Sequence, residues 1–237
     1  MVLQHVEHED LENIEEFFST SKFEFTKIKL FKNQKIPKKL EDFSMMIVLG
    51  GPMDTWMEDK YPWLIDEKES IKRFVVDLKK PFLGICLGCQ LLGEVLGARV
   101  LKSKKSEIGF CEVKSRKHLN KDKIFNFLPN NFEVFQWHSY EVKKIQDKNF
   151  KILVSSKSTD VQLFKYKDNA YGMQFHLEIK EDTIKKWLKI NSNREYLRKF
   201  ISEKDLSKFN EISVNKIHII SGLCEILVKN FSRMISN

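Results

Sequence analysis

Two stretches in the first part of the chain combine a short, continuous apolar run with glycine or proline at its borders. Residues 41–50 contain the run Met-Met-Ile-Val-Leu, closed by Gly50-Gly51-Pro52, and residues 82–86 contain a second run directly after Pro81. Apolar runs of this length between turn residues are typical of strands that are buried on both faces. The pattern therefore predicts two buried strands, each followed by a tight turn.

Two other stretches place their apolar residues at helical spacing. Residues 64–79 carry apolar side chains among charged ones, and residues 87–96 repeat this spacing up to Gly97, which suits the end of a helix. The order strand, helix, strand, helix with short joints is the pattern of a parallel sheet with helices on both faces. We therefore predict a three-layer α/β/α fold with a mostly parallel sheet, of the flavodoxin-like or Rossmann-like kind.

The second half of the chain is richer in strands and ends in a helical segment. The expected strands are 108–114, 132–136, 151–155, 161–166 and 170–179, with a hairpin turn at 167–169. From residue 181 to residue 237 proline is absent, glycine occurs once, and apolar residues recur at helical spacing. We divide the chain into an α/β domain, residues 1–180, and a helical C-terminal extension, residues 181–237. The apolar stripe of the extension is expected to pack on its own domain, with a homodimer contact as the alternative to a monomer.

The joint between the second buried strand and the following helix has the pattern of a nucleophile turn. Cys86 lies between Gly84 and Gly88, two residues away on either side. A nucleophile on a sharp strand-to-helix turn needs small residues at these positions, because the strained backbone leaves no room for a Cβ atom. A helix that begins here would favour the thiolate and would direct backbone N–H groups toward a developing oxyanion. On this segment alone, a buried cysteine on a tight turn is an equally good interpretation.

A second segment, residues 171–179, supplies a base and a carboxylate. Alternation along a strand places Gln174, His176 and Glu178 on one face and the apolar residues between them on the other. A histidine that shares a face with a nearby carboxylate has the partner that a general base needs. Together with the cysteine turn, this segment predicts a catalytic triad of Cys86, His176 and Glu178. An intact triad also argues against a non-catalytic binding protein with the same fold.

Three motifs occur in an order and at a spacing that are typical of one enzyme family. They are Leu-Gly-Gly-Pro at 49–52, Gly-Ile-Cys-Leu-Gly-Cys-Gln at 84–90 and Gln-Phe-His-Leu-Glu at 174–178. On these motifs the chain resembles the class I glutamine amidotransferases over about residues 1–180. It is most similar to the stand-alone members described as GMP-synthase-like. The resemblance implies the α/β fold expected above and a cysteine nucleophile that works without a metal or an organic cofactor.

The resemblance also implies how the triad would act. Cys86 would attack the γ-carbonyl of a glutamyl side chain, form a thioester and release ammonia or an amine. His176 would move the proton between the thiol and the leaving nitrogen, and Glu178 would orient His176. The backbone N–H groups of Gly51 and Leu87 would form the oxyanion hole. By the same resemblance, the substrate would be held by Gly50, Met53, Gln90, His138, Ser139 and Tyr140.

One loop departs from the family pattern. The family commonly has Trp-His-Gly-Asp or Ser-His-Gly-Asp where this chain reads Trp-His-Ser-Tyr-Glu at 137–141, so Tyr140 replaces the acid expected to meet the substrate's α-ammonium group. Glu141 is the nearest substitute if the loop is shifted by one residue. Two hydrolase functions therefore stay open. One is a glutaminase whose ammonia goes to a separate synthetase subunit. The other is a free-standing γ-glutamyl peptidase.

The second cysteine of the turn adds a more distant alternative. Cys86-x-x-Cys89 at the start of a helix is also the spacing of a dithiol redox protein. Redox motifs require neither the two flanking glycines nor a downstream His-x-Glu, so this interpretation is the weaker one. A zinc site is not expected, because a second ligand pair at zinc spacing is missing. His5 and His8 are expected in the loop that follows a first strand.

The composition limits which partners and which cellular compartment we expect. The 41 Lys and Arg residues exceed the 33 Asp and Glu residues by eight, but only six are arginine and the lysines are dispersed, so we expect no nucleic-acid partner. No apolar run approaches the ~18 residues of a membrane span. The four cysteines come without a secretion signal, so we expect a cytoplasmic protein without a membrane contact. The 237 residues leave no room for a synthetase domain beside residues 1–180, so a synthetase would be a separate chain.

Overall fold

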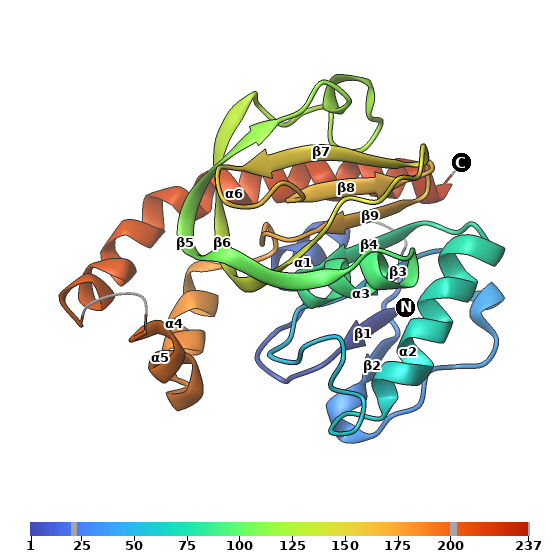
Figure 1. Cartoon of the computed structure of the whole chain (residues 1–237), viewed down its shortest axis with the longest axis horizontal. Helices are drawn as coiled ribbons and strands as arrows, with labels where there is room; N and C mark the ends of the chain where they lie inside the picture. The colour runs from blue at the N-terminus through green and yellow to red at the C-terminus, as the bar shows by residue number, and fades with distance from the viewer. Residues whose placement is uncertain (20–22, 200–202, 237) are drawn as a thin grey trace.

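The computed structural model describes residues 1–19, 23–199 and 203–236. Figure 1 shows one large sheet with helices packed on it. Within the described ranges the sheet has nine strands in the order β2-β1-β3-β4-β9-β8-β7-β5-β6. These strands are β1 Val2–Gln4, β2 Lys27–Lys29, β3 Met46–Val48, β4 Phe82–Ile85, β5 Val100–Ser115, β6 Asn131–Val142, β7 Phe150–Ser156, β8 Leu163–Tyr166 and β9 Ala170–Met173. The α-helices are α1 Asn13–Phe18, α2 Trp63–Lys72, α3 Leu87–Val95, α4 Glu181–Lys189, α5 Asn191–Leu197 and α6 Glu203–Ser236.

The sheet has a parallel half and an antiparallel half. Strands β2, β1, β3, β4 and β9 pair in parallel, whereas β8, β7, β5 and β6 are joined by antiparallel pairing. Parallel neighbours need a crossover connection, and α2 supplies the one from β3 to β4. The α/β fold class is confirmed, and the antiparallel half corresponds to the strand-rich segment after residue 107.

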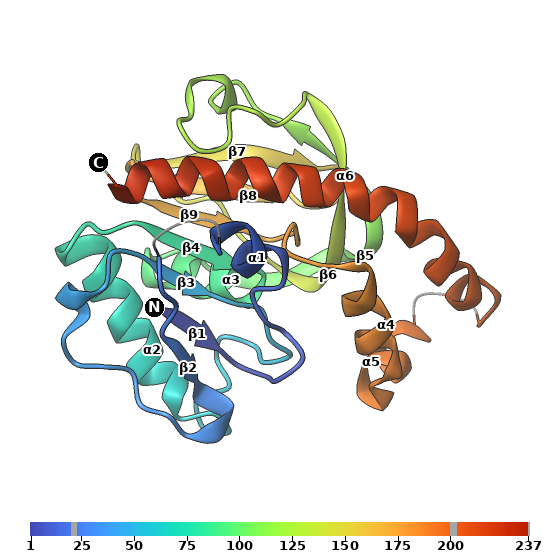
Figure 2. The ribbon, with the colours of Figure 1, turned by 180° about the vertical axis from the view of Figure 1, so that it is seen from behind.

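Side chains of the parallel strands alternate between two apolar cores, one on each face. Leu3 and Met46 belong to the core covered by α2 and α3. Their neighbours Val2 and Ile47 belong to the core covered by α1 and α6. Figure 2 shows α1 and α6 together on this second face of the sheet. Burial on both faces explains why the first strands of this chain read as continuous apolar runs.

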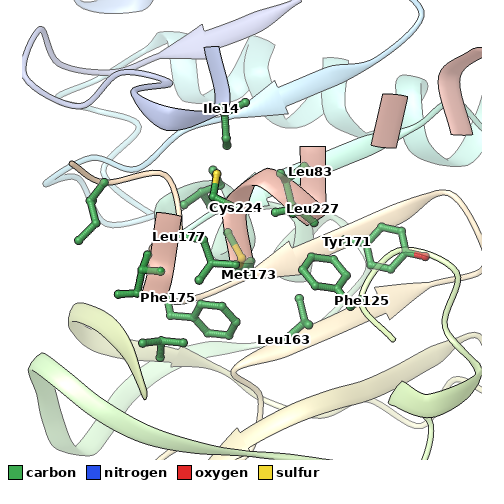
Figure 3. Packing of buried hydrophobic residues seen from close by; sticks show 14 of the residues in the cluster. Ile14, Leu83, Phe125, Leu163, Tyr171, Met173, Phe175, Leu177, Cys224 and Leu227 are labelled. Atoms are coloured by element: carbon green, nitrogen blue, oxygen red, sulfur yellow. The ribbon is translucent and has the colours of Figure 1, made fainter. Parts of the chain in front are cut away.

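The long C-terminal helix α6 forms much of the outer layer on the second face. Its residues Ile220, Cys224 and Leu227 are buried in that core, and Figure 3 shows Cys224 and Leu227 close to Ile14 and Met173. Helix α6 also packs along α1. The apolar stripe of the extension therefore packs on its own domain. The division of the chain at residue 180 stays a prediction.

Two strands are shorter than the apolar pattern suggested. Strand β3 is three residues long, because residues 40–42 form a 3-10 turn ahead of it. The expected strand over 170–179 is wrong beyond Met173, where β9 ends. Met173 is opposite Ile85 of β4 and Leu163 of β8, the last and first residues of those strands. Beyond Met173 the neighbouring strands β4 and β8 offer no further residues for strand pairing, so β9 ends.

The other expected elements are present with changed ends. The helix predicted over 64–79 is α2 followed by a π-helical turn over Arg73–Asp77. Strands β5 and β6 extend well past the predicted cores of 108–114 and 132–136, because they pair with each other along most of their length. The hairpin at 167–169 connects Tyr166 and Ala170, which face each other across β8 and β9.

Candidate active site

Cys86 occupies the joint between β4 and α3, with a backbone φ of 51°. This is the left-handed region, which a residue with a side chain adopts only where its surroundings hold it there. A Cβ atom at Gly84 would lie 2.3 Å from the carbonyl oxygen of Gly88, and one at Gly88 would lie 2.2 Å from that of Val48. Neither position has room for a side chain, so the steric reason for both glycines is confirmed.

His176 and Glu178 lie on the irregular segment between β9 and α4. The Nδ1 atom of His176 is 2.5 Å from Oε1 of Glu178, and both residues are buried. The backbone N–H of His176 donates to the carbonyl of Phe135 on β6 at 2.9 Å, and the imidazole packs edge-on against Trp187 of α4. The two side chains therefore meet as expected, but a bent segment anchored to β6, and not strand alternation, brings them together.

The charges around His176 favour the protonated imidazole. Burial of the ring lowers its pKa, but the Glu178 carboxylate and the neighbouring Cys86 thiol outweigh burial and raise the pKa of His176 well above its ordinary value. An imidazolium beside a cysteine stabilises the thiolate, which is the nucleophilic form of the side chain. The arrangement can therefore supply a nucleophile and a proton donor at the same place.

A pocket of about 340 Å³ opens over the Cys86 turn. Its walls come from the segments that follow β1, β3, β4 and β9, with β6 and helices α4 and α5 at its side. This is the carboxyl edge of the parallel strands, where ligand sites of open α/β sheets lie. The predicted site residues that line the pocket are Gly51, Met53, Cys86, Leu87, Gln90, His138, Ser139, Tyr140 and His176.

Two residues in the pocket lining have unused backbone donors. Within the described residues, the N–H groups of Gly51 and Leu87 donate to no acceptor in the protein. The next amides of α3 are used, since Gly88 donates to the carbonyl of Leu49 at 3.2 Å and Gln90 to that of Cys86 at 3.1 Å. Free N–H groups at the start of a helix and on the adjoining loop suit an anionic oxygen.

Gln90 and the loop of residues 137–140 form one wall of the pocket. The side-chain nitrogen of Gln90 donates to the carbonyl of Tyr140 at 3.2 Å and to Oε1 of Gln174 at 3.1 Å. Both hydrogens of this amide are thereby used, so its oxygen is the group of Gln90 that can meet a ligand. The hydroxyl of Ser139 shares a 2.6 Å hydrogen bond with that of Ser106.

His138 supports this wall through both of its ring nitrogens. Nδ1 lies 2.9 Å from the carbonyl oxygen of Tyr140, and Nε2 lies 3.3 Å from Oε2 of Glu107. Burial of the Glu107 carboxyl favours the neutral acid, but contacts with His138 and with two hydroxyl groups outweigh burial and lower the pKa of Glu107. His138 therefore holds the loop in place.

Three residues considered at the sequence level lie outside the pocket lining. Glu178 sits behind His176. Gly50 is buried, and its carbonyl oxygen is 2.8 Å from Nδ1 of His5. Glu141, the nearest substitute for the missing loop acid, is buried and pairs with Lys143 at 2.7 Å. The loop therefore brings no carboxylate to the pocket.

Glu9 is a pocket residue that sequence reasoning missed. It lies in the loop after β1, and its Oε2 atom is 2.2 Å from the point where a Cβ atom at Gly50 would be. Burial raises the pKa of Glu9 to about 7, although His176 and His5 favour the carboxylate. The available signal was its position, because residues directly after a parallel strand reach the functional edge of the sheet.

Aromatic rings surround the pocket. Trp137 and Trp187 line it, and Trp187 is tied down by a 3.0 Å hydrogen bond from its Nε1 to the carbonyl of His8. Trp56, which is 49% exposed, packs edge-on against Tyr140 with ring centroids 4.9 Å apart. Trp187 belongs to the segment after residue 180, so the α/β domain as divided from the sequence does not hold the whole pocket.

The second cysteine of the turn is unsuited to redox exchange. Cys89 is fully buried in the core beneath α3, and burial raises its pKa well above the ordinary value. Both Cys86 and Cys89 are free thiols. A resolving cysteine needs access and thiolate character, and Cys89 has neither.

The described part of the chain contains neither a cluster of metal ligands nor a membrane-spanning helix. Among those residues, three or more His, Cys, Asp or Glu side chains nowhere gather as a metal site would require. The described helices include none that is both long and apolar enough to span a bilayer.

Comparison with known proteins finds relatives that are named as GMP synthase. One of them, from Sulfolobus acidocaldarius, is a subunit of GMP synthase (glutamine-hydrolyzing). It is 33% identical over 147 residues, which is 62% of this chain and 73% of that protein. The GMP synthase (glutamine-hydrolyzing) of Borreliella burgdorferi is 31% identical over 155 residues, 65% of this chain and 27% of that protein. The chain thus spans about a quarter of the length of the latter relative.

A solved structure resembles the whole chain. The crystal structure of a glutamine amidotransferase from Thermotoga maritima superposes with a TM-score of 0.86 at 30% identity, covering 100% of this chain and 97% of the other. The family model described as glutamine amidotransferase class-I matches residues 11–191. That match includes the Cys86 turn, the His176–Glu178 pair and α4. The chain belongs to the class I glutamine amidotransferase family.

Proposed function

We propose that the chain hydrolyses the γ-amide of glutamine through a thioester on Cys86, with His176 and Glu178 completing a catalytic triad. The observation that carries this proposal is the meeting of the strained Cys86 turn and the buried His176–Glu178 pair at one pocket. Membership of the class I glutamine amidotransferase family supports the same chemistry.

The triad would divide the reaction into two steps. In the first, the Cys86 thiolate attacks the γ-carbonyl carbon, the C–N bond breaks, and protonated His176 gives its proton to the leaving nitrogen. Ammonia leaves and a thioester remains. In the second, water gives a proton to His176 and adds to the thioester, so that glutamate leaves and the thiol is restored. The bond from Nδ1 to Glu178 keeps Nε2 as the nitrogen that moves the proton.

The negative oxygen that forms in each step needs donors that are already in place. The unused N–H groups of Gly51 and Leu87 suit this role, since both residues line the pocket beside Cys86. Preorganised backbone donors of this kind stabilise the tetrahedral intermediate more than the ground state, because the charge is concentrated on the oxygen there.

The α-amino acid end of the substrate would lie along the wall made by Gln90 and the 137–140 loop. The free side-chain oxygen of Gln90 can accept a hydrogen bond from an α-ammonium group. Glu9 places a carboxyl group in the same pocket, beside Gly50. Its negative form would favour a substrate with a free ammonium group over an N-acylated one.

We further propose that the ammonia is used by a separate synthetase chain. The Sulfolobus acidocaldarius relative is named as one subunit of GMP synthase, a name that implies a second subunit for that protein. A separate synthetase predicts that glutamine hydrolysis becomes faster when the partner and its substrates are present. A free-standing hydrolase predicts a rate that does not depend on any partner.

One observation favours a second candidate, a γ-glutamyl peptidase. Tyr140 lines the pocket where the family commonly has an acid, and Trp56 packs on it. This aromatic pair gives the pocket an apolar border that suits a leaving group larger than ammonia.

The test is to compare substrates and two cysteine variants. Wild type, Cys86→Ala and the matched control Cys89→Ala are given glutamine, γ-glutamyl anilides and γ-glutamyl dipeptides, and release of ammonia or amine is measured. Cys86→Ala should lower every rate by at least about 10³-fold, whereas Cys89→Ala should stay within about threefold of wild type because its thiol is buried away from the pocket. Release from dipeptides and not from glutamine would replace the glutaminase by the peptidase. Release that survives in Cys86→Ala would refute both.

A further inference from the structure

A buried histidine–glutamate pair lies directly behind the pocket, outside the triad. His5 follows β1, and Glu67 projects from α2. The Nε2 atom of His5 is 2.9 Å from Oε1 of Glu67, and both side chains are completely inaccessible to solvent. The other ring nitrogen, Nδ1, is 2.8 Å from the carbonyl oxygen of Gly50. A pair of ionisable groups is costly to bury, so its single further contact is informative.

The hydrogen atoms in this chain of contacts can be assigned. A carbonyl oxygen only accepts, so Nδ1 of His5 carries a proton and donates it to Gly50. Burial lowers the pKa of His5, but Glu67 and the carbonyl of Gly50 outweigh burial and raise that pKa above its ordinary value. An imidazolium donates from both nitrogens, and its bond to Gly50 is then charge-assisted.

The carbonyl that His5 holds belongs to the same peptide as one of the pocket amides. A trans peptide is planar, and its C=O and N–H groups point in opposite directions. No cis peptide occurs among the described residues. The Gly50 carbonyl is directed to the buried side, toward His5, so the N–H of Gly51 is directed to the opposite side. Gly51 itself lines the pocket, and its N–H has no acceptor within the described protein.

This peptide has unusual freedom, because it lies between two glycines. Rotation of the whole peptide changes ψ of Gly50 and φ of Gly51, and neither residue has a Cβ atom to resist the change. An N–H group without an acceptor adds no resistance from the pocket side. The hydrogen bond from His5 therefore provides the restoring contact, and the close packing of the His5 Cβ atom, 3.0 Å from a Cβ position at Gly51, adds to it.

We propose that His5 and Glu67 are positioning residues that fix the Gly50–Gly51 peptide with its N–H directed into the pocket, and thereby preform the oxyanion hole. Glu67 orients His5, His5 holds the carbonyl, and the peptide transmits the orientation to the catalytic donor. A proton donor on the carbonyl also polarises the peptide and makes its N–H a stronger donor. The inference rests on the proposed function, because it assigns a role in the same thioester chemistry.

The test uses variants that separate the two contacts of His5. His5→Phe keeps a flat ring and removes both hydrogen bonds. His5→Asn places an amide N–H near the position of Nδ1 and so keeps the donor to Gly50. Glu67→Gln keeps the shape of the partner and removes its charge. For each variant kcat and KM for glutamine, the thermal unfolding midpoint, and the rate at which iodoacetamide alkylates Cys86 are measured. The alkylation rate is read from the peptide that carries Cys86.

The alkylation rate distinguishes the proposed role from a general structural one. A general loss of structure at the site would slow alkylation, whereas loss of the oxyanion hole alone would not. Alkylation needs the Cys86 thiolate and His176, but it builds no charge on a carbonyl oxygen and does not need the oxyanion hole. His5→Phe should lower kcat by roughly 30- to 100-fold, since loss of one oxyanion donor costs 10²–10³. KM and the alkylation rate should stay within about threefold. His5→Asn should recover at least about tenfold of the lost kcat, and Glu67→Gln should fall between wild type and His5→Phe.

Each other result overturns the inference. A kcat of His5→Phe within about threefold of wild type would show that catalysis does not need the hydrogen bond from His5 to Gly50. Alkylation that slows as much as turnover would place the effect on the triad instead of the oxyanion hole. If His5→Phe does not fold, His5→Asn and Glu67→Gln decide, and a folded His5→Asn that loses as much kcat as is expected for His5→Phe would contradict the inference, because its amide N–H keeps the donor to Gly50. The wild-type arm decides the proposed function separately, since it asks only whether Cys86-dependent release occurs.

Discussion

The Glu9 side chain lies in the pocket, where burial makes its charged form less stable than in the unfolded chain. Its carboxyl group lies against Gly50, within the electrostatic reach of His5, His176 and Glu178. Burial raises its pKa to about 7, so near neutral pH the group is divided between acid and carboxylate. An ionisable side chain with such a shift in a pocket is more typical of a functional group than of a structural one.

The shift predicts how stability depends on pH. The pKa of Glu9 rises from 4.5 to about 7 on folding, so the folded state holds the proton more tightly than the unfolded state. The stability that this proton adds is complete below pH 4.5 and is lost as the pH rises through about 7. Glu9→Gln should remove this dependence. The difference in free energy of unfolding between the variant and wild type should shift in favour of the variant by up to about 3 kcal/mol between pH 4 and pH 8.

Urea unfolding of both proteins at several pH values measures this difference. Glu16→Gln is a suitable control, because Glu16 is mostly exposed and pairs only at the surface. Parallel pH profiles for wild type and Glu9→Gln would contradict the prediction.

At the scale of single residues, the sequence predicted the groups that are close along the chain. Cys86 was recognisable from its flanking glycines, and His176 and Glu178 from their mutual spacing. Glu9 was marked only by its position in the loop after a first strand, and Trp187 reaches the pocket from a helix that no local pattern connects to it. Their contribution depends on which strand lies beside which, and spacing along the chain does not contain that information.

At the scale of elements, the β4–α3 joint has no room for a side chain at two positions. The backbone passes so close to Val48 at Gly88, and to Gly88 at Gly84, that a methyl group at either position would overlap a carbonyl oxygen. The overlap involves backbone on both sides, so no side-chain rotation relieves it. This is the packing that presents Cys86 at the pocket.

Gly88→Ala should therefore be severely destabilising. Its Cβ atom would lie 2.2 Å from the Val48 carbonyl oxygen, and we expect a loss of about 3 kcal/mol or more in the free energy of unfolding. The control is Gly222→Ala on α6, where nothing lies within 4 Å of the new Cβ atom. That substitution should stabilise the chain by about 0.5–1 kcal/mol, since alanine favours a helix over glycine. Chemical denaturation of both variants checks the pair, and equal effects would contradict it.

The type of an element could be predicted where its side chains are buried in a regular pattern along the chain. The runs that became β3 and β4 are apolar because both faces are covered. Beyond Met173, the alternation of apolar and polar residues continues without a strand. His176 is held there by one bridge to Phe135, and Glu178 by His176. Alternation reflects which side chains face the core, and an irregular segment produces it as readily as a strand.

In the molecule as a whole, the C-terminal helix closes the second core. Helix α6 covers sheet residues and α1, and its side chains Ile217 and Phe231 are buried with the rest of that core. Without the helix, the part of this face that α6 covers would be exposed as an apolar surface. The helix packs as one outer layer on the sheet of the α/β domain expected over residues 1–180.

Removal of residues 203–237 should therefore abolish cooperative folding. The shortened chain is expected to bind a hydrophobic dye and to lose its sharp thermal transition, because α1 and α4 would leave the part of the core now packed against α6 exposed. The matched point variants are Leu227→Ala, which should cost about 2–5 kcal/mol in the core, and Ile219→Ala, whose side chain is 66% exposed and should be neutral. A truncated chain that unfolds cooperatively would show that residues 203–237 are separable from the rest of the fold.

The placement of the tryptophans makes the pocket visible to spectroscopy. Of the four in the chain, Trp137 and Trp187 line the pocket and Trp56 stands at its border against Tyr140. Entry of a ligand would exchange water around these indoles for an organic group and would change their emission. The folded chain thus carries built-in optical reporters of occupancy. A variant that binds without turnover, such as Cys86→Ala, could be titrated by its own fluorescence and its substrates ranked by affinity.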